Sequence, residues 1–322
     1  MTSWFQDLAG RLAGGGRLTA GEEITPERVA SADPLDLMAL ARLSASLTGP
    51  PPFTCGIINI KSGRCGEDCA FCAQSGRYQT GNPSYPMLSP AEILSRAENI
   101  VEAGANYVGL VASGASLSEP DFASLMVTAE AFKKRFKVGL CTSIGSLDPE
   151  RARALKSAGF ASCHHNLEAA PSFFPNICTT HTTEDRLKSI RAVKEAGLRV
   201  CCGGIFGVGE NWAQRLELAA LVAELGVNSV PINFLMPVPG TPLADRPLLP
   251  PGEALKIIAA FRLLNPESDI LICGGREMTL GGLKSLIYSA GANGLMIGDY
   301  LTAKGSSIAG DIADMQALEL WR

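Results

Sequence analysis

The chain has 322 residues, of which 46% are hydrophobic and 19% charged, and its 28 basic and 32 acidic side chains give a net charge of −4. This composition is typical of a soluble globular protein, and the absence of a long Lys/Arg tract argues against a nucleic-acid or anionic-membrane partner. No apolar stretch reaches the roughly 18 residues of a transmembrane helix, and residues 1–16 lack the apolar segment of a secretory signal. We therefore expect a cytoplasmic protein.

The first 52 residues are predicted to form an N-terminal extension. Residues 1–33 are weakly patterned and include Gly14-Gly15-Gly16, which favours a flexible leader. From Pro34 onward, apolar residues recur at helical spacing, which predicts a packing helix.

Apolar β-like runs then recur along the chain, and small-residue/Gly pairs that suit helix C-termini precede several of them. We predict a helix over residues 90–103 and strands at 55–60, 106–111, 137–141, 160–165, 199–202, 227–233, 269–272 and 294–298. The repeat of about 31 residues predicts an α/β fold, a (β/α)8 TIM-type barrel over residues 53–310 with a helical tail at 311–322. The alternative is a doubly wound open sheet, whose dinucleotide-binding form would need a Gly-x-Gly-x-x-Gly turn that is missing after the first strand.

Ten cysteines are far too few for a disulfide-stapled secreted scaffold. Isolated ones, such as Cys163 and Cys178, are interpreted as small buried apolar side chains. Three others follow the first strand as a C-x3-C-x2-C motif, Cys65, Cys69 and Cys72. A structural zinc site normally has a fourth ligand and none is near in sequence, so the triplet favours an iron-sulfur cluster with one open iron, or a catalytic metal.

Polar residues at other strand ends predict a pocket. His164, Asn166 and Glu168 share one face because strand side chains alternate, and His165 follows His164 directly. We interpret Asn166 and Glu168 as functional, and a structural role remains open for either histidine. Arg276 stands between glycines and Glu277 at the end of the seventh strand, where a site role and an internal ion pair are both open.

The motif of Cys65, Cys69 and Cys72 resembles that of the radical S-adenosylmethionine (SAM) superfamily, in which three thiolates hold a 4Fe-4S cluster and the fourth iron binds SAM. From about Pro34 to Lys304 the chain resembles the biotin synthase family within it. The matching stretches are residues 63–75, 165–168, 179–186, 200–210, 229–233, 240–243, 274–277 and 298–302.

This resemblance implies sulfur insertion into dethiobiotin, with two SAM molecules consumed, a homodimer and a flavodoxin-type electron donor. It implies cofactor or substrate contacts for Asn166, Glu168, Tyr78, Asn233 and Thr302, with Asn233 at the ureido ring and Thr302 at the valeryl carboxylate. It also implies catalytic roles for Arg276, Asn166 and Asn233. An amide suits a urea-like group because it both donates and accepts hydrogen bonds without burying charge.

The family carries a second, 2Fe-2S cluster that supplies the sulfur, held by three cysteines and an arginine. Cys141, Cys201 and Arg276 match three of those positions, whereas Gly109 replaces the expected cysteine of the second strand. Cys55, on the adjacent first strand about 4.8 Å away, is expected to replace it.

The resulting ligand set is Cys55, Cys141, Cys201 and Arg276, with Cys202 and Cys273 as candidates to complete it. These extra thiols make a cluster of different nuclearity conceivable, and each is also compatible with simple packing.

Two other functions remain open at this point. One is another barrel-type radical SAM enzyme, such as a hydrogenase-maturation or pyrrolysine-pathway protein, with a different substrate. The other is an iron-sulfur carrier or redox-sensing module, which would need no polar pocket.

Overall fold

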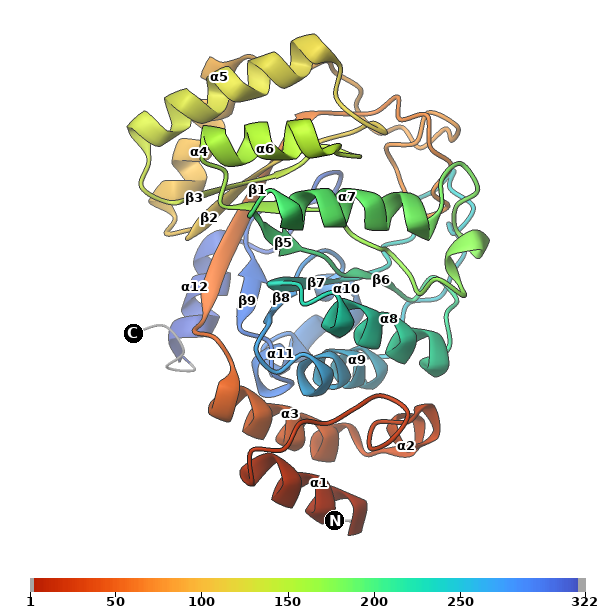
Figure 1. Cartoon of the computed structure of the whole chain (residues 1–322). Helices are drawn as coiled ribbons and strands as arrows, with labels where there is room; N and C mark the ends of the chain where they lie inside the picture. The colour runs from red at the N-terminus through yellow and green to blue at the C-terminus, as the bar shows by residue number, and fades with distance from the viewer. Residues whose placement is uncertain (1–2, 318–322) are drawn as a thin grey trace.

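Parallel strands form the centre of the molecule and position the candidate site residues. The computed structural model describes residues 3–317. Within them one sheet contains β1 (Phe53–Lys61), β2 (Tyr107–Ala112), β3 (Gly139–Ser143), β4 (Ser162–His164), β5 (Arg199–Cys201), β6 (Gly204–Phe206), β7 (Ser229–Phe234), β8 (Asp269–Ile272) and β9 (Gly294–Met296). The strand order is β5-β4-β3-β2-β1-β9-β8-β7-β6, and an additional pairing of β5 with β7 closes the sheet into a barrel (Figure 1).

β5 and β6 are two halves of one barrel strand. Cys201 pairs with Ser229 and Gly204 pairs with Ile232, so both halves keep the same register against β7. Counted in this way, the described part of the chain contains eight parallel barrel strands. The predicted (β/α)8 barrel is confirmed, and the open sheet is excluded because the sheet has closed.

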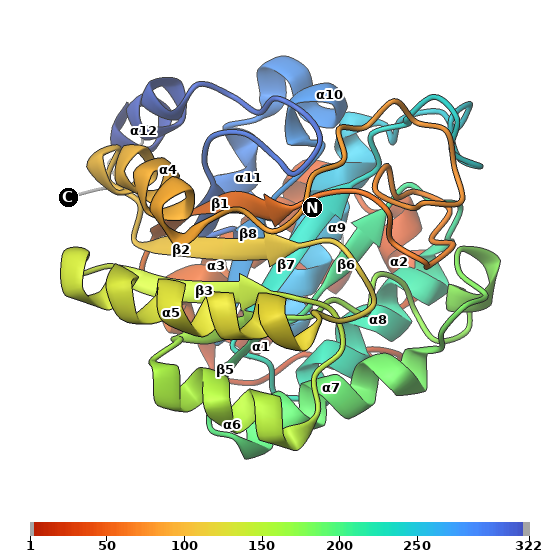
Figure 2. The same ribbon diagram turned by 90° about the horizontal axis from the view of Figure 1, so that it is seen from above.

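Helices surround the strands (Figure 2). The outer helices are α4 (Pro90–Glu102), α5 (Glu119–Arg135), α6 (Pro149–Ala158), α7 (Thr183–Glu195), α8 (Trp212–Glu224) and α9 (Pro251–Leu264), followed by the short α10 (Arg276–Leu280) and α11 (Leu286–Ser289). Two 3-10 turns, η1 (Phe174–Asn176) and η2 (Gly281–Leu283), complete this set. Gly159 ends α6 with a φ of 89°, as a glycine at a helix C-terminus is expected to do.

Alternation along each strand separates a helix-facing side from a cavity-facing side. In β1 the even-numbered residues are buried, and the odd-numbered ones are half-buried. Phe53, Cys55 and Ile57 line the barrel interior, so the even-numbered side chains face the helices. The same alternation decides which cysteines reach the site.

The N-terminal segment is helical, and the expectation of a flexible leader was wrong. It forms α1 (Ser3–Ala13), α2 (Pro26–Ser31) and α3 (Pro34–Thr48). α3 is the predicted packing helix and lies against α9, and α1 packs on α3 at the edge of the molecule (Figure 1). Leu8 and Leu12, one helical turn apart on α1, are buried, so α1 has an apolar face of the kind that a packed helix needs.

The described chain ends in α12 (Ile308–Ala317), part of the predicted helical tail, whereas residues 318–322 of that tail lie outside the described residues. Across residues 3–317, no helix combines the length and apolarity needed to cross a bilayer.

An ion pair ties α12 to the barrel. The Asp311 carboxylate accepts a hydrogen bond from Nη2 of Arg276 at 2.7 Å, and the two side chains are 2% and 1% exposed. We expect Asp311→Ala to lower the free energy of unfolding by about 3 kcal/mol, because it leaves the buried guanidinium with Glu277, 3.1 Å from Nη2, as its remaining charge partner. Thermal unfolding measures this effect.

Asp314→Ala is the matched control on the same helix. Asp314 pairs with Lys284 at the surface, with side chains 37% and 33% exposed. Its loss should cost less than about 1 kcal/mol. Equal losses in the two variants would contradict a special role for the buried pair.

Candidate active site

A cavity of about 450 Å³ occupies the barrel interior. It is lined by inward-facing residues of the strands and by the loops that follow β1, β4, β7 and β9. These loops lie at the carboxyl ends of the strands, where (β/α)8 barrels carry their active sites.

The three cysteines of the C-x3-C-x2-C motif lie in the loop between β1 and α4, and all three line the cavity. Within that loop the N–H of Cys72 donates to the carbonyl of Cys69, and the N–H of Cys65 donates to the carbonyl of Gln74. Burial raises the pKa of the Cys72 thiol. Three soft sulfur donors facing one cavity fit an iron-sulfur cluster that keeps one metal position toward the substrate side.

Asp68 anchors this loop to the segment before α7. Its carboxylate accepts hydrogen bonds from the backbone N–H groups of Thr179 at 2.9 Å and Thr180 at 3.2 Å. Although desolvation opposes them, these bonds, with the side-chain bond from Thr179 first, keep the pKa of Asp68 below its usual range. Residues more than 100 positions apart in sequence are thereby held together at the rim.

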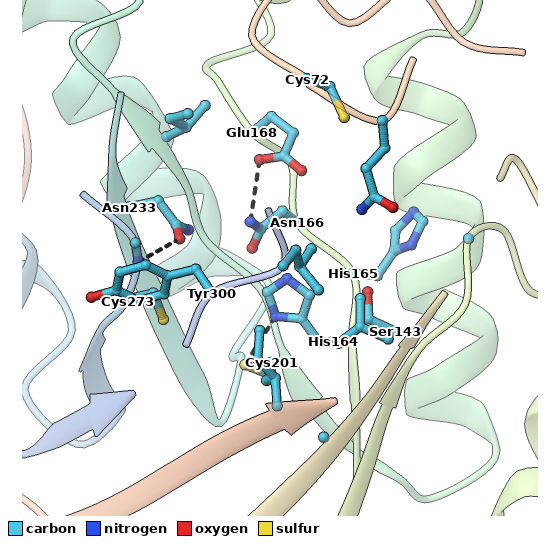
Figure 3. A pocket seen from close by; sticks show the side chains of 18 of the residues that line it. Cys72, Ser143, His164, His165, Asn166, Glu168, Cys201, Asn233, Cys273 and Tyr300 are labelled. Atoms are coloured by element: carbon cyan, nitrogen blue, oxygen red, sulfur yellow. Dashed lines mark hydrogen bonds between the residues drawn. The ribbon is translucent and has the colours of Figure 1, made fainter. Parts of the chain in front are cut away.

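Asn166 and Glu168 meet Arg186 at the end of β4. Nδ2 of Asn166 donates to Oε2 of Glu168 at 3.2 Å (Figure 3), and Nη1 of Arg186 donates to the Asn166 carbonyl at 2.8 Å. Burial raises the pKa of Glu168, and the nearby Arg186 acts in the opposite direction. Glu168 has a φ of 66°, a left-handed conformation that a non-glycine residue rarely adopts outside functional sites.

The two histidines line the cavity as neutral groups. Desolvation lowers the pKa of His164 to about 4 and that of His165 to about 3. Nδ1 of His164 lies 3.4 Å from Sγ of Cys201 (Figure 3), whereas Nε2 of His165 is buried without a hydrogen-bond partner among the described residues. The cavity therefore offers imidazole hydrogen-bonding groups without adding charge.

Asn233 and Thr302, although far apart in sequence, line the same cavity as these groups. Nδ2 of Asn233 donates to the Gly204 carbonyl, and its Oδ1 accepts from the Gly274 N–H, both at 3.2 Å. These bonds fix the amide across β6, β7 and the end of β8. Neighbouring Tyr300, also in the lining, donates its hydroxyl to Glu277 at 2.8 Å.

Four further cysteines, on or just after barrel strands, face the cavity. They are Cys55 of β1, Cys141 of β3, Cys201 of β5 and Cys273 after β8. In barrel order these are the first, third, fifth and seventh strands, and alternate strands are the ones that contribute to one layer of a (β/α)8 interior. Burial raises the pKa of Cys201 well above its usual value, and the nearby Cys273, Cys55 and Cys141 thiols raise it further. We call these four side chains the thiol layer. Sulfur is the donor that soft metals prefer, although within residues 3–317 no three of these sulfurs lie within 4.8 Å of one another.

Of the two extra thiols, only Cys273 lies in this thiol layer. Cys202 is fully buried but does not line the cavity, because it follows the inward-facing Cys201 and so faces the helices. Gly109, at the position where a cysteine is expected, also lines the cavity and has no side chain to ligate a metal. The residues of the thiol layer have the donor type that an iron-sulfur cluster needs, and they come from alternate strands.

The structure places Arg276 and Tyr78 outside the cavity lining. The Arg276 guanidinium donates to the Met296 carbonyl at 2.5 Å and to Asp311, so it makes the internal ion pair that was the open alternative at sequence level. Both Nη atoms of Arg276 thus have partners away from the cavity lining, and its expected ligand and catalytic roles stay predictions. Tyr78 donates its hydroxyl to the Asp68 carbonyl at 2.5 Å and so supports the cysteine loop instead of facing the cavity.

Three residues at the site were missed at sequence level as site residues, Cys178, His181 and Arg186. Arg186 and His181 line the cavity, and the thiol of Cys178 lies 3.8 Å from that of Cys69. The signal for two of them was present, because both lie in the stretch 179–186 that resembles the family. Cys178 was interpreted as a buried apolar side chain. Its local signal was the Cys-x2-His spacing to His181, whose Nδ1 lies 3.3 Å from the Cys178 sulfur.

Two family models match the chain. The Radical SAM superfamily model matches residues 59–222, about half of the chain, and the Biotin and Thiamin Synthesis associated domain matches residues 231–320. Curated relatives include a biotin synthase of Nitratidesulfovibrio vulgaris (strain DSM 19637 / Miyazaki F), 50% identical over 94% of this chain and 85% of the relative. Another is a biotin synthase of Pelotomaculum thermopropionicum, 45% identical over 94% of this chain and 97% of the relative.

Solved structures with the same fold are more distant in sequence. Methylornithine synthase superposes with a TM-score of 0.82 at 18% identity, covering 97% of this chain and 96% of that one. The FeFe-hydrogenase maturase from Carboxydothermus hydrogenoformans superposes with a TM-score of 0.81 at 16% identity, covering 98% and 78%. At such identities the likeness shows the fold alone, so the two enzymes named as alternatives gain no functional support from it.

Proposed function

The chain belongs to the biotin synthase family of the radical SAM superfamily, and on this premise we propose how its own residues divide the work of inserting sulfur into dethiobiotin. The observation that carries the proposal is that the triplet, the polar groups and the thiol layer all line one cavity. A carrier or redox-sensing module would have no use for such a polar chamber between two sets of thiols. We further propose that the enzyme works as a homodimer with a flavodoxin-type electron donor.

Cys65, Cys69 and Cys72 are assigned to a 4Fe-4S cluster at the rim, and the thiol layer to the auxiliary cluster that the family carries. When bound, these groups supply the electron that cleaves SAM to the hydrogen-abstracting 5′-deoxyadenosyl radical, and the sulfur that enters the product. For the auxiliary cluster we keep Cys55, Cys141 and Cys201 as ligands and add Cys273 in place of Arg276. Because burial raises their thiol pKa values, metal loading must displace their protons.

The polar groups are assigned to binding and orientation. Asn166 and Glu168 hold the nucleoside of SAM near the rim, and Arg186 fixes both through the contacts described above. Asn233 binds the ureido ring, and Thr302 binds the carboxylate tail of dethiobiotin. His164 and His165 are neutral, so they add no charge to the cavity in which the uncharged ureido ring would bind.

Anaerobic turnover of dethiobiotin with SAM and a reductant tests the function, with mass spectrometry for biotin and 5′-deoxyadenosine. Both products are expected, and both should require the reductant. Formation of 5′-deoxyadenosine without biotin, from protein with full iron content, would contradict the proposed substrate.

Asn233→Ala tests the ureido contact. We expect kcat/KM for dethiobiotin to fall about 10–100-fold, because a site that hydrogen-bonds its substrate discriminates strongly once that hydrogen-bonding group is lost. Steady-state kinetics measure the change, with the KM for SAM as internal control. A parallel rise in the KM for SAM would show that the truncation disturbs the whole cavity instead of one contact.

A further inference from the structure

A second set of metal-ligand atoms lies beside the cysteine triplet. Within residues 3–317, Cys69, Cys178 and His181 offer ligand atoms that all lie within 4.8 Å of one another. Cys65 and Cys72 do not belong to this compact group, although they share the loop with Cys69. This compact group therefore shares only Cys69 with the three cysteines assigned to the rim cluster.

The distances match a tetrahedral zinc site. Bonds of about 2.3 Å to sulfur and about 2.0 Å to nitrogen place two sulfurs about 3.8 Å apart and a sulfur and a nitrogen about 3.5 Å apart. The Cys69 and Cys178 sulfurs are 3.8 Å apart, and Nδ1 of His181 is 3.3 Å from the Cys178 sulfur. Oδ1 of Asp68 lies 3.2 Å from the same sulfur but is not part of the compact group found within residues 3–317.

The surroundings favour a soft divalent cation. Cys69 and Cys178 are buried, and with the imidazole they form a two-sulfur, one-nitrogen set of the kind that zinc accepts. Glu67 lies 2.7 Å from Nδ1 of His181 and adds a second carboxylate beside the site. Nε of Arg186 donates to Nε2 of His181 at 3.1 Å, so zinc on Nδ1 requires the ring proton to move to Nε2 and Arg186 to turn away.

We propose that the chain, before its rim cluster is assembled, binds one Zn²⁺ ion through Cys69, Cys178 and His181, with a solvent molecule as fourth ligand. Binding releases the two thiol protons, as thiolate ligation requires. The proposal rests on the proposed function in one respect, the sharing of Cys69 with the 4Fe-4S cluster. Because one thiolate cannot complete both sites, zinc and cluster exclude each other, and zinc blocks cluster assembly.

The test uses the full-length, cluster-free chain, kept reduced with a phosphine and titrated with Zn²⁺ against a chromophoric chelator. We expect one zinc per chain, and Cys178→Ala should weaken binding at least about tenfold because it removes a thiolate ligand. Cys65→Ala is the matched control, since it disables the cluster motif and leaves the zinc ligands intact. Co²⁺ substitution provides an independent readout, a thiolate-to-cobalt absorption band that Cys178→Ala weakens and Cys65→Ala retains.

The opposite pattern would overturn the proposal. If Cys65→Ala lowers zinc affinity and Cys178→Ala does not, zinc occupies the triplet, and if wild type binds no stoichiometric zinc, there is no site. Circular dichroism of each variant shows whether lost binding reflects lost folding. Reconstituted Cys178→Ala should still cleave SAM, and its cluster assembly should become insensitive to added zinc, so failure of the zinc site and failure of the proposed function remain distinguishable.

Discussion

Cys72→Ala should abolish formation of both 5′-deoxyadenosine and biotin, with turnover falling by more than about 100-fold. Loss of an outer-shell partner of a metal site already costs 10–100-fold, and loss of a direct ligand costs more. Cys72 lines the same cavity as Glu168, one of the residues assigned to SAM binding (Figure 3). Product analysis by mass spectrometry, with iron and sulfide counts, measures the effect.

Cys163→Ala is the control for a general loss of thiol content. Cys163 belongs to β4 but faces the helices, is 1% exposed and does not line the cavity. It should keep both products and full iron content. If Cys72→Ala retained SAM cleavage while Cys163→Ala lost it, the assignment of the motif to the rim cluster would be wrong.

The barrel could be predicted because its signals are local. Each strand is a short apolar run, and glycines such as Gly159 mark where the preceding helices end. The same reasoning missed the helices within residues 1–33, although local signals were present there. The buried Leu8 and Leu12 of α1 are spaced one helical turn apart, and Thr25 caps α2, which begins at Pro26.

The site divides in a similar way. The triplet is contiguous, and Asn166 and Glu168 sit two residues apart on one strand end, so spacing alone brings their donors together. Arg276 shows the limit of this reasoning: a strand-end arginine suits a cluster ligand and a buried ion pair equally well, and spacing does not reveal its bond to Asp311, 35 residues later. The approach of Cys178 to Cys69 depends on how two loops fold, which spacing does not encode.

Side chains alternate between the two faces of a strand, and this alternation, which can be read from the sequence, decides which cysteines belong to the thiol layer. Cys201 and Cys202 are neighbours, yet only the first lines the cavity, because successive strand residues point to opposite faces. This makes Cys202 an internal control for any experiment on Cys201 or on the thiols that accompany it. It also explains how a cysteine can leave the Gly109 position without loss of a donor, because Cys55 and Cys273 reach the same interior from other strands.

Cys55→Ser and Cys273→Ser should each separate SAM cleavage from sulfur insertion. Both variants keep the rim triplet, so SAM cleavage to 5′-deoxyadenosine should persist, whereas biotin yield should fall by more than about 100-fold because a direct ligand of the sulfur-supplying centre is lost. Iron and sulfide per chain should fall by the content of the auxiliary cluster. Serine preserves the side-chain volume, so the comparison tests ligation and not packing.

Cys202→Ala supplies the contrast, with full iron content and full biotin yield expected. The two serine variants also separate two ligand sets. If Cys55→Ser alone loses the auxiliary iron, three thiolates hold the centre and Cys273 only packs against it; if both lose it, all four strands contribute. Intact iron and biotin yield in Cys55→Ser would refute the transfer of a ligand from the second strand to the first, because Gly109 leaves the second strand with no thiol in the cavity.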